Sequence, residues 1–224
     1  MCGRYVLKAS MKDMKTLYGA IPDGTFDFTP IYNVTPTFNM PVVVQPTGSV
    51  RIIYTYRWGL VPSWANEINT KYSMINARSE TLTNKKTFQR PFQQQRCIVP
   101  ASGFYEWKKG PDGVKVPYYI TLSTGSLMSF AGLYERWRSP EGQTINSFTI
   151  ITTPASKTME PLHYRMPALL VSGEFDQWMN PNNTDTNLLS DLLRPYPDDG
   201  IKFHPVSPLV NSPRNQGESL IDPK

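Results

Sequence analysis

The residue with the most distinctive chemistry in this sequence is a cysteine at its second position, in Met-Cys-Gly-Arg. An initiator methionine is removed when the next side chain is small, so we expect Met1 to be lost. The mature chain would then begin with an α-amine and a thiol on one residue. A neutral amine forms a Schiff base with an aldehyde, and the thiol can close on the imine carbon to give a five-membered thiazolidine. Cys2 is therefore a candidate aldehyde trap.

Two other interpretations of Cys2 stay open at this point. In an N-terminal nucleophile hydrolase the α-amine acts as the base and the thiol attacks an amide. The simplest interpretation, favoured without other evidence, is a small residue that merely follows Met1. The other cysteine, Cys97, lies in an apolar stretch and is expected to be a core thiol.

Alternating polar residues form a second candidate group. Asn76, Arg78 and Glu80 would share one face of an extended segment. An asparagine can orient a hydroxyl or carbonyl, and an arginine can hold a phosphate. A loop whose polar groups satisfy local backbone is the better interpretation if this pattern is taken alone.

Two further residues have types suited to proton transfer. Glu106 lies between Tyr105 and Trp107 in a largely apolar run, and such surroundings suit a carboxylate to this role. A solvent-facing glutamate on an edge strand is about equally consistent with the pattern. His163 precedes Arg165 by two positions, so the pair could relay protons beside a phosphate. A structural histidine is the more common case.

Aromatic and basic residues provide weaker signals. Trp58 and Trp64 flank a Gly/Pro loop, where exposed rings would stack on bases and buried rings would pack in a core. A later stretch could form a basic aromatic patch or a solvated face; it contains Lys85, Lys86, Phe88, Arg90, Phe92 and Arg96.

The elements that must position these residues are mostly strands. Ser10 to Tyr18 has a capping pattern, a shared apolar face and a terminating Gly19, which predict a helix. Two later helices are expected, at 173–179 and 185–193. Alternating apolar patterns predict strands at 42–44, 50–58, 97–99, 104–108, 116–122, 127–137, 148–152 and 168–171, with a tight hairpin at Asp112-Gly113. We predict one α+β domain with a mostly antiparallel, barrel-like β core and a few short peripheral helices.

Composition sets further limits. The 224 residues carry a net charge of +5, which is compatible with a polyanionic partner but is a weak signal alone. No apolar run is long enough for a membrane span, so a cytoplasmic protein is expected. Two cysteines and two histidines without CxxC or HxxH spacing predict no metal site, and no cofactor is expected.

Seven motifs in a fixed order make the combination specific. They are Met-Cys-Gly-Arg at the start, then 32–36 (YNVTP), 58–62 (WGLVP), 75–80 (INARSE), 97–107, 163–167 (HYRMP) and 210–215 (VNSPRN). The chain thereby resembles the SOS-response-associated peptidase (SRAP) family, whose members crosslink to abasic sites in single-stranded DNA. The resemblance spans essentially the whole chain, which we interpret as one SRAP-like domain over 1–224.

The resemblance implies a role for each matching residue. Cys2 would form the thiazolidine with the ring-opened sugar, Asn76 would hold the sugar or the amine, Glu106 would transfer protons around the Schiff base, and His163 would assist ring opening. The phosphate contacts would come from Arg4, Arg78 and Arg165. Trp64 lies in a loop that resembles the family's wedge between bases.

The resemblance also implies a function. We expect a monomer that binds single-stranded DNA in the cytoplasm, on the nucleoid, and shields abasic sites from strand cleavage, with lyase or self-release activity as an extension. A cysteine peptidase or N-terminal nucleophile hydrolase is the alternative, and its peptidase action could be limited to removing Met1. A non-catalytic single-strand binder would need the basic and aromatic residues but no free Cys2 amine.

Overall fold

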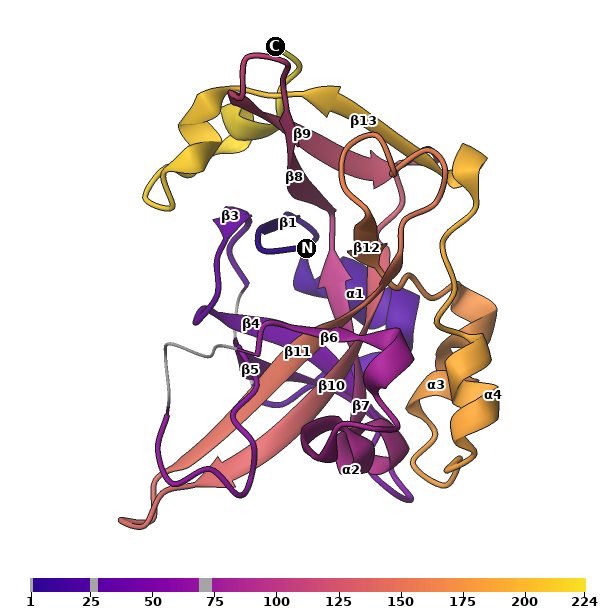
Figure 1. Ribbon diagram of the computed structural model, residues 1–224. Coiled ribbons are helices and arrows are strands. Elements are labelled where there is room, and N and C mark those ends of the chain that lie inside the picture. The colour runs from indigo at the N-terminus through magenta and orange to yellow at the C-terminus, as the bar shows by residue number, and fades with distance from the viewer. Residues whose placement is uncertain (1, 25–27, 69–73) are drawn as a thin grey trace.

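A closed ring of five strands forms the centre of the computed structural model, which describes residues 2–24, 28–68 and 74–224 (Figure 1). Neighbouring strands in the ring are antiparallel, except that β5 and β11 pair in parallel and so close it. The ring strands, in order, are β5 (Arg51–Trp58), β4 (Asn39–Val44), β7 (Arg96–Ala101), β10 (Met128–Arg138) and β11 (Thr144–Pro154). The fold is thus an α+β domain with a barrel core.

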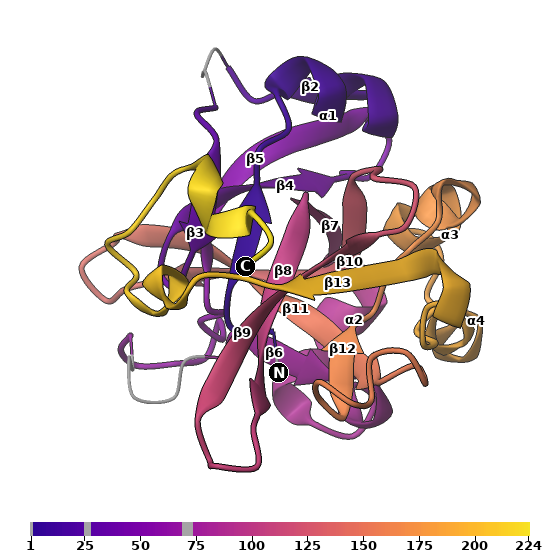
Figure 2. The ribbon, with the colours of Figure 1, turned by 90° about the horizontal axis from the view of Figure 1, so that it is seen from above.

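An antiparallel sheet of five strands lies over one end of this barrel, as the two views in Figures 1 and 2 agree. Its order is β13 (Ile201–Pro205), β9 (Lys115–Leu122), β8 (Gly103–Lys109), β1 (Tyr5–Leu7) and β3 (Ile31–Val34). Three short strands extend the barrel: β2 (Ala20–Pro22) on β5, and β6 (Asn76–Arg78) and β12 (Arg165–Pro167) on β11. β6 and β12 flank β11, because Thr152 pairs with both Arg78 and Pro167.

Short helices pack on the outside of the strands (Figure 1). They are α1 (Met11–Tyr18), α2 (Lys86–Gln94), α3 (Phe175–Met179) and α4 (Thr186–Asp191), with 3₁₀ turns at Ser79–Thr81, Ser172–Glu174, Asp198–Gly200, Pro208–Asn211 and Glu218–Ile221. Ser10 caps α1 in a capping box with Asp13, and Gly19 ends it in the left-handed conformation with φ 57°. No helix among the described residues is both long and apolar enough to span a bilayer.

The core joins the barrel to the second sheet through aromatic rings. Tyr5 of β1 is fully buried and meets Trp58 edge-on at 5.1 Å and Phe130 at 6.1 Å between ring centroids. Phe104 of β8 also meets Phe130, at 6.0 Å. Rings of this size each contribute about 1.5–3 kcal/mol on burial, so β1 is held firmly beside the start of the chain.

The predicted fold class is confirmed, together with the α1 helix, its caps and the hairpin at Asp112-Gly113 between β8 and β9. The strand predicted at 168–171 is wrong: β12 ends at Pro167, and only Leu169 makes an isolated bridge, to Phe130. No strand was predicted at the positions of β1, β2, β3 and β13, which are short. No helix was predicted at the position of α2, which contains Pro91 in its interior.

Candidate active site

Cys2 is completely buried just before β1, where the barrel and the second sheet meet. Asn76 Nδ2 donates a hydrogen bond to the carbonyl oxygen of Cys2 at 2.8 Å, so β6 of the barrel fixes this residue from one side. Strand β8 fixes it from the other, because Tyr105 N–H donates to the Arg4 carbonyl at 3.0 Å. Met1 lies outside the described residues.

Glu106 is close enough to Cys2 for their charges to interact. The β1–β8 register pairs Tyr5 with Phe104 and Val6 with Gly103, and its continuation brings Glu106 opposite Gly3. Burial, followed by the negative charge of Glu106, raises the pKa of the Cys2 thiol well above its usual range. The sulfur is therefore a neutral thiol near pH 7, with a carboxylate nearby that can take its proton.

The environment of Glu106 excludes one of the two interpretations that the sequence left open. Its side chain is only 5% exposed, and β8 has neighbours on both sides, β1 and β9. The alternative of a solvent-facing glutamate on an edge strand is therefore wrong. A carboxylate in this interior position is costly to desolvate, which indicates a specific use.

Asn76 and Arg78 share a face of β6, as the alternation predicted, while Ala77 between them is buried. The register with β11 pairs Asn76 with Ile150 and Arg78 with Thr152. Asn76 Oδ1 is buried without a hydrogen-bond partner among the described residues, and the Arg78 side chain is exposed. Glu80 does not continue the alternation, because Ser79–Thr81 forms a 3₁₀ turn.

Arg165 is buried and committed to internal contacts. Its guanidinium binds both carboxylate oxygens of Glu80, and its Nη2 also donates to the Thr152 carbonyl at 2.5 Å. These hydrogen bonds hold the pKa of Glu80 below its usual range. The structure thus gives Arg165 an internal role, and a phosphate contact from it stays a prediction.

His163 adjoins this ion pair through the backbone of Arg165. The Arg165 N–H lies 3.0 Å from His163 Nδ1 and the Arg165 carbonyl lies 3.2 Å from it, so the N–H is the closer partner. Donation from the N–H makes Nδ1 an acceptor and leaves the neutral ring's proton on Nε2. The ring stacks on the exposed Tyr164, with centroids 4.5 Å apart. His163 is therefore held in one orientation at the edge of the protein surface.

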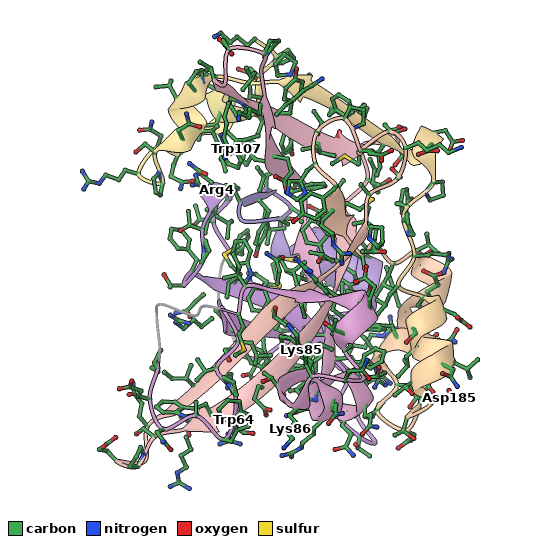
Figure 3. The ribbon with its side chains drawn as sticks, viewed as in Figure 1. Arg4, Trp64, Lys85, Lys86, Trp107 and Asp185 are labelled. Carbon is green, nitrogen blue, oxygen red and sulfur yellow. The ribbon has the colours of Figure 1, made fainter. Side chains whose placement is uncertain are left out.

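Arg4 joins the beginning of the chain to its end. Its Nη1 donates to Asn33 Oδ1 and to the Val210 carbonyl, both at 2.8 Å, and the guanidinium lies 5.6 Å from the centre of the Trp107 ring (Figure 3). Burial lowers the pKa of Arg4. Asn33 in turn donates to the carbonyls of Val210, Ser212 and Asn215. Arg4 is thus partly structural in this arrangement.

Comparison with known proteins identifies the group to which this arrangement belongs. A family described as SOS response associated peptidase (SRAP) matches residues 1–213. The chain belongs to the SRAP family. It is 42% identical to the abasic site processing protein YoqW of Bacillus subtilis, over 99% of both chains. It is 35% identical to the abasic site processing protein HMCES of Xenopus tropicalis, over 86% of this chain and 66% of that one.

Solved structures show the same SRAP fold. A protein from Bacteroides thetaiotaomicron has a TM-score of 0.88 with 25% identity and full coverage of both chains. A protein from Bordetella bronchiseptica has a TM-score of 0.76 with 29% identity, over 92% of this chain and all of that one. The recognised family and the fold class therefore agree.

Two SRAP motifs that received no role in the sequence analysis hold each other in the structure. Asn33 lies in the motif at 32–36, and its three carbonyl partners lie in or beside the motif at 210–215. Gln216 completes the contact by accepting from the N–H groups of Tyr32 and Asn33. No sequence pattern signals this pairing, because the two motifs lie far apart along the chain.

The two tryptophans that flank the Gly/Pro loop, of which Trp64 belongs to the expected wedge, have different surroundings in this SRAP chain. Trp58 is fully buried and belongs to the core, whereas Trp64 is 66% exposed. The Trp64 loop rests on β10, where Trp137 Nε1 donates to the Ala65 carbonyl at 2.6 Å. Figure 3 shows Trp64 far from Arg4 and Trp107, so it is not part of the cluster around Arg4.

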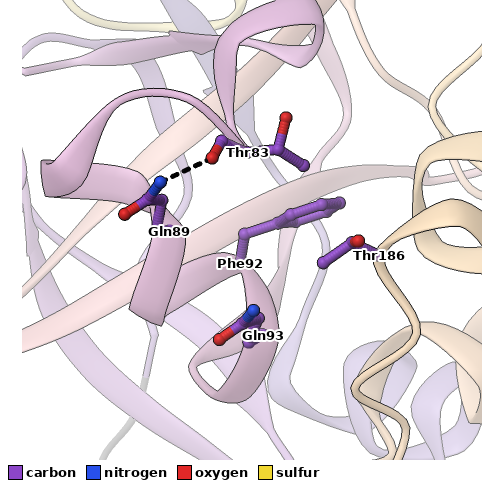
Figure 4. Close-up of a pocket in the computed structure, with 5 residues that line it drawn as sticks. All are labelled: Thr83, Gln89, Phe92, Gln93 and Thr186. Atoms are coloured by element: carbon purple, nitrogen blue, oxygen red, sulfur yellow. Dashed lines mark hydrogen bonds between the residues drawn. The ribbon is translucent and has the colours of Figure 1, made fainter.

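The stretch with the alternatives of a basic aromatic patch and a solvated face fits neither of them throughout. Phe88, Phe92 and Arg96 are buried, and only Lys85, Lys86 and Arg90 are exposed. A pocket of about 340 Å³ lies on this side of the molecule, lined by Thr83, Gln89, Phe92, Gln93 and Thr186 (Figure 4). None of the predicted site residues lines it. Among the described residues, no group of three or more His, Cys, Asp or Glu side chains is arranged to hold a metal.

Proposed function

We propose that this protein captures abasic sites in single-stranded DNA covalently through Cys2, after Met1 has been removed. The observation that carries the proposal is the position of Cys2, held by Asn76 on one side and close to Glu106 on the other. Membership of a family whose curated relatives are named abasic site processing proteins supports it. A small residue that merely follows Met1 would need no such surroundings.

The first step uses the α-amine that Met1 removal creates. The amine attacks the aldehyde carbon of the ring-opened sugar, a C–N bond forms, and the carbinolamine loses water to give an iminium ion. Asn76 Oδ1, buried without a partner among the described residues, can accept a hydrogen bond from this amine. Glu106 takes a proton from the α-ammonium group, which makes the amine neutral, and returns this proton to the carbinolamine hydroxyl so that it leaves as water.

The second step uses the thiol. The Cys2 sulfur attacks the iminium carbon, a C–S bond closes the five-membered ring, and the thiol proton is released. Since burial keeps this thiol protonated, attack needs a base. Glu106, whose charge acts on the thiol, is that base. The net reaction consumes one aldehyde and yields one thiazolidine and one water, without an external oxidant or reductant.

His163 acts on the sugar in this proposal. Its Nε2–H can donate a hydrogen bond to the ring oxygen of the closed sugar, and this favours opening: the bond from C1 to the ring oxygen breaks, the ring oxygen gains a proton and the C1 hydroxyl loses one, which leaves the aldehyde. The same proton transfers in the reverse direction would release the adduct. Elimination from the Schiff base would give lyase activity from the same residues.

DNA binding before the reaction relies on charge and stacking. The net charge of +5 favours a polyanion, and the exposed Arg78 lies two residues from Asn76 on the same face. Trp64 is exposed enough to stack on a base of a single strand. Arg4 and Arg165 can contribute positive charge near Cys2 and Arg78, although both also make internal contacts.

Intact mass of the purified protein, alone and with abasic single-stranded DNA, tests the proposal. We expect the mass without Met1 and, with DNA, an adduct that survives denaturation. Cys2→Ala should abolish this adduct while still permitting a reversible imine. Cys97→Ala is the matched control, because Cys97 is an equally buried thiol that has no free amine. The same stable adduct from Cys2→Ala would contradict the thiazolidine.

The peptidase alternative predicts a different result in the same samples. The family description itself names a peptidase, which is what favours this alternative. Cleavage of a peptide substrate that depends on Cys2, in a protein that forms no DNA adduct, would support an N-terminal nucleophile hydrolase. Removal of Met1 alone would be compatible with both functions.

A further inference from the structure

We propose that Glu80 is a positioning residue of this site: through its ion pair with Arg165 it fixes the backbone N–H that sets the tautomer of His163. This inference deepens the proposed function and rests on it for the role of His163. Glu80 would not touch the substrate. It would act through Arg165, and its effect would appear on the imidazole ring.

The two partners of the ion pair differ in burial. The Arg165 side chain is 8% exposed, whereas that of Glu80 is 47% exposed. A buried guanidinium needs its hydrogen bonds satisfied, because an unpaired buried charge is costly. Glu80 supplies two of the acceptors and the Thr152 carbonyl supplies another, so Glu80 is the only carboxylate that holds this arginine among the described residues.

The strand that carries Arg165 is short. β12 has three residues, begins at Arg165 and pairs with the end of β11, where Arg165 lies opposite Pro154. One backbone hydrogen bond, from the Ala155 N–H to the Tyr164 carbonyl at 3.0 Å, holds the peptide before Arg165, and Pro154 has no N–H to add a second. The side-chain anchor at Glu80 and Thr152 therefore supplies the further attachment that fixes the rotation of this peptide.

The orientation of the Arg165 backbone determines the hydrogen bond that His163 makes. The His163 Nδ1 faces both the N–H and the carbonyl of Arg165, at 3.0 and 3.2 Å, so a small turn of that residue would exchange a donor for an acceptor. With the N–H as the closer partner, Nδ1 accepts and the proton of the neutral ring is on Nε2, the nitrogen that the proposed function uses as a donor. Such outer contacts commonly decide the tautomer of a functional histidine.

Nitrogen NMR of the histidine rings tests the inference without DNA. The chain has two histidines, and His204 provides an internal reference, because its Nε2 lies 2.8 Å from the Ile221 carbonyl and must carry the proton. At mildly alkaline pH we expect both rings in the wild type to show the Nε2-protonated tautomer. In Glu80→Gln, the His163 nitrogens should shift toward the average of the two tautomers while His204 stays unchanged.

Two further variants sharpen this measurement. Arg165→Lys keeps the charge and the backbone N–H but loses the two-point contact, so it should shift His163 in the same direction. Glu174→Gln is the matched control, since Glu174 pairs with Arg194 elsewhere in the molecule. An unchanged His163 in Glu80→Gln would overturn the inference, and so would equal shifts of His163 and His204.

The rate of adduct formation, measured beside the NMR signals, distinguishes a failure of this inference from a failure of the proposed function. If His163 assists ring opening, Glu80→Gln should slow adduct formation by between a few-fold and roughly 10²-fold, as for other small misplacements of a reacting group. A tautomer shift without any change in rate supports the positioning by Glu80 and removes His163 from the reaction. A protein that forms no adduct at all contradicts the proposed function, and the NMR result still decides the role of Glu80.

Discussion

Two arginines are buried in the part of the chain that the structure describes, Arg96 and Arg165, and their partners differ in kind. Arg96 binds five backbone carbonyls, those of Phe92, Gln93, Trp178, Asn180 and Asn183. Arg165 binds a carboxylate, that of Glu80, and the Thr152 carbonyl. The first arginine joins the ends of α2 and α3, whereas the second lies beside a histidine.

The difference indicates what each arginine can do. Carbonyls at the C-terminal ends of helices carry partial negative charge and are fixed by the fold, so Arg96 is a structural connection. A half-exposed carboxylate is a partner that protonation or a competing anion can replace. We therefore describe the Arg96 corner as structural, and the Cys2 region (Cys2, Asn76, Arg78, Glu106, His163 and Arg165) as the proposed region of chemistry.

The largest effect on chemistry is expected at Glu106. Glu106→Gln keeps the shape but removes the proposed base for the thiol proton, so single-turnover adduct formation should fall by roughly 10²–10⁴-fold, while DNA binding changes little. Glu135→Gln is the control, because Glu135 is an equally buried glutamate of the barrel, on β10. Similar rates for wild type and Glu106→Gln would remove Glu106 from the proposed reaction.

The largest effect on stability is expected at Arg96. Arg96→Met leaves five carbonyls without their donor, and we expect a loss of about 3–5 kcal/mol in the free energy of unfolding. Urea denaturation measures this loss. Adduct formation per folded molecule should stay at the wild-type rate. A loss below about 1 kcal/mol would show that water replaces the guanidinium easily.

A smaller effect is expected on the salt dependence of DNA binding. Arg78 is exposed beside Asn76, so Arg78→Ala should reduce the slope of log affinity against log salt concentration by about 0.7 for the lost phosphate contact. Lys86→Ala, an exposed cation at the start of α2, is the matched control and should leave the slope unchanged. Equal slopes for both variants would argue against a phosphate at Arg78.

The fold class and the candidate residues could be predicted from the sequence better than the residues that those candidates contact. Local rules were sufficient for α1, because Ser10, Asp13 and Gly19 act within one helix. They did not indicate α2, which contains Pro91 in its interior and buries Phe88 and Phe92 against the core. Tertiary burial outweighed the local preference in that case.

The same limit applies to the arginines. Both arginines have partners far away in the sequence, such as Asn183 for Arg96 and Glu80 for Arg165, although Arg96 also binds two nearby carbonyls of α2. No spacing rule connects such pairs. A family motif can name an arginine, but only the fold shows whether its charge faces outward.

The smallest expected effect is a pH-dependent change in folding stability, which we expect from the ion pair of Arg165 and not from the carbonyl contacts of Arg96. Hydrogen bonds from Arg165 lower the pKa of Glu80 in the folded protein below its ordinary value of 4.5. A carboxylate whose pKa is lower in the folded protein stabilises the fold at pH values above its unfolded-state pKa. This contribution is lost as the pH falls through the folded-state pKa. Wild type should therefore exceed Glu80→Gln in stability above about pH 4.5, and the two should converge below it.

The half-exposed position of Glu80 limits the size of this difference to about 1 kcal/mol at most. Denaturation by urea at a series of pH values measures it. The Arg96→Met background provides the control, because Arg96 and Arg165 share no partner and their effects should add. We expect the pH-dependent loss of stability that Glu80→Gln causes to persist unchanged in that background. Disappearance of this loss there would mean that the two regions are coupled, and the distinction between a structural corner and a region of chemistry would fail.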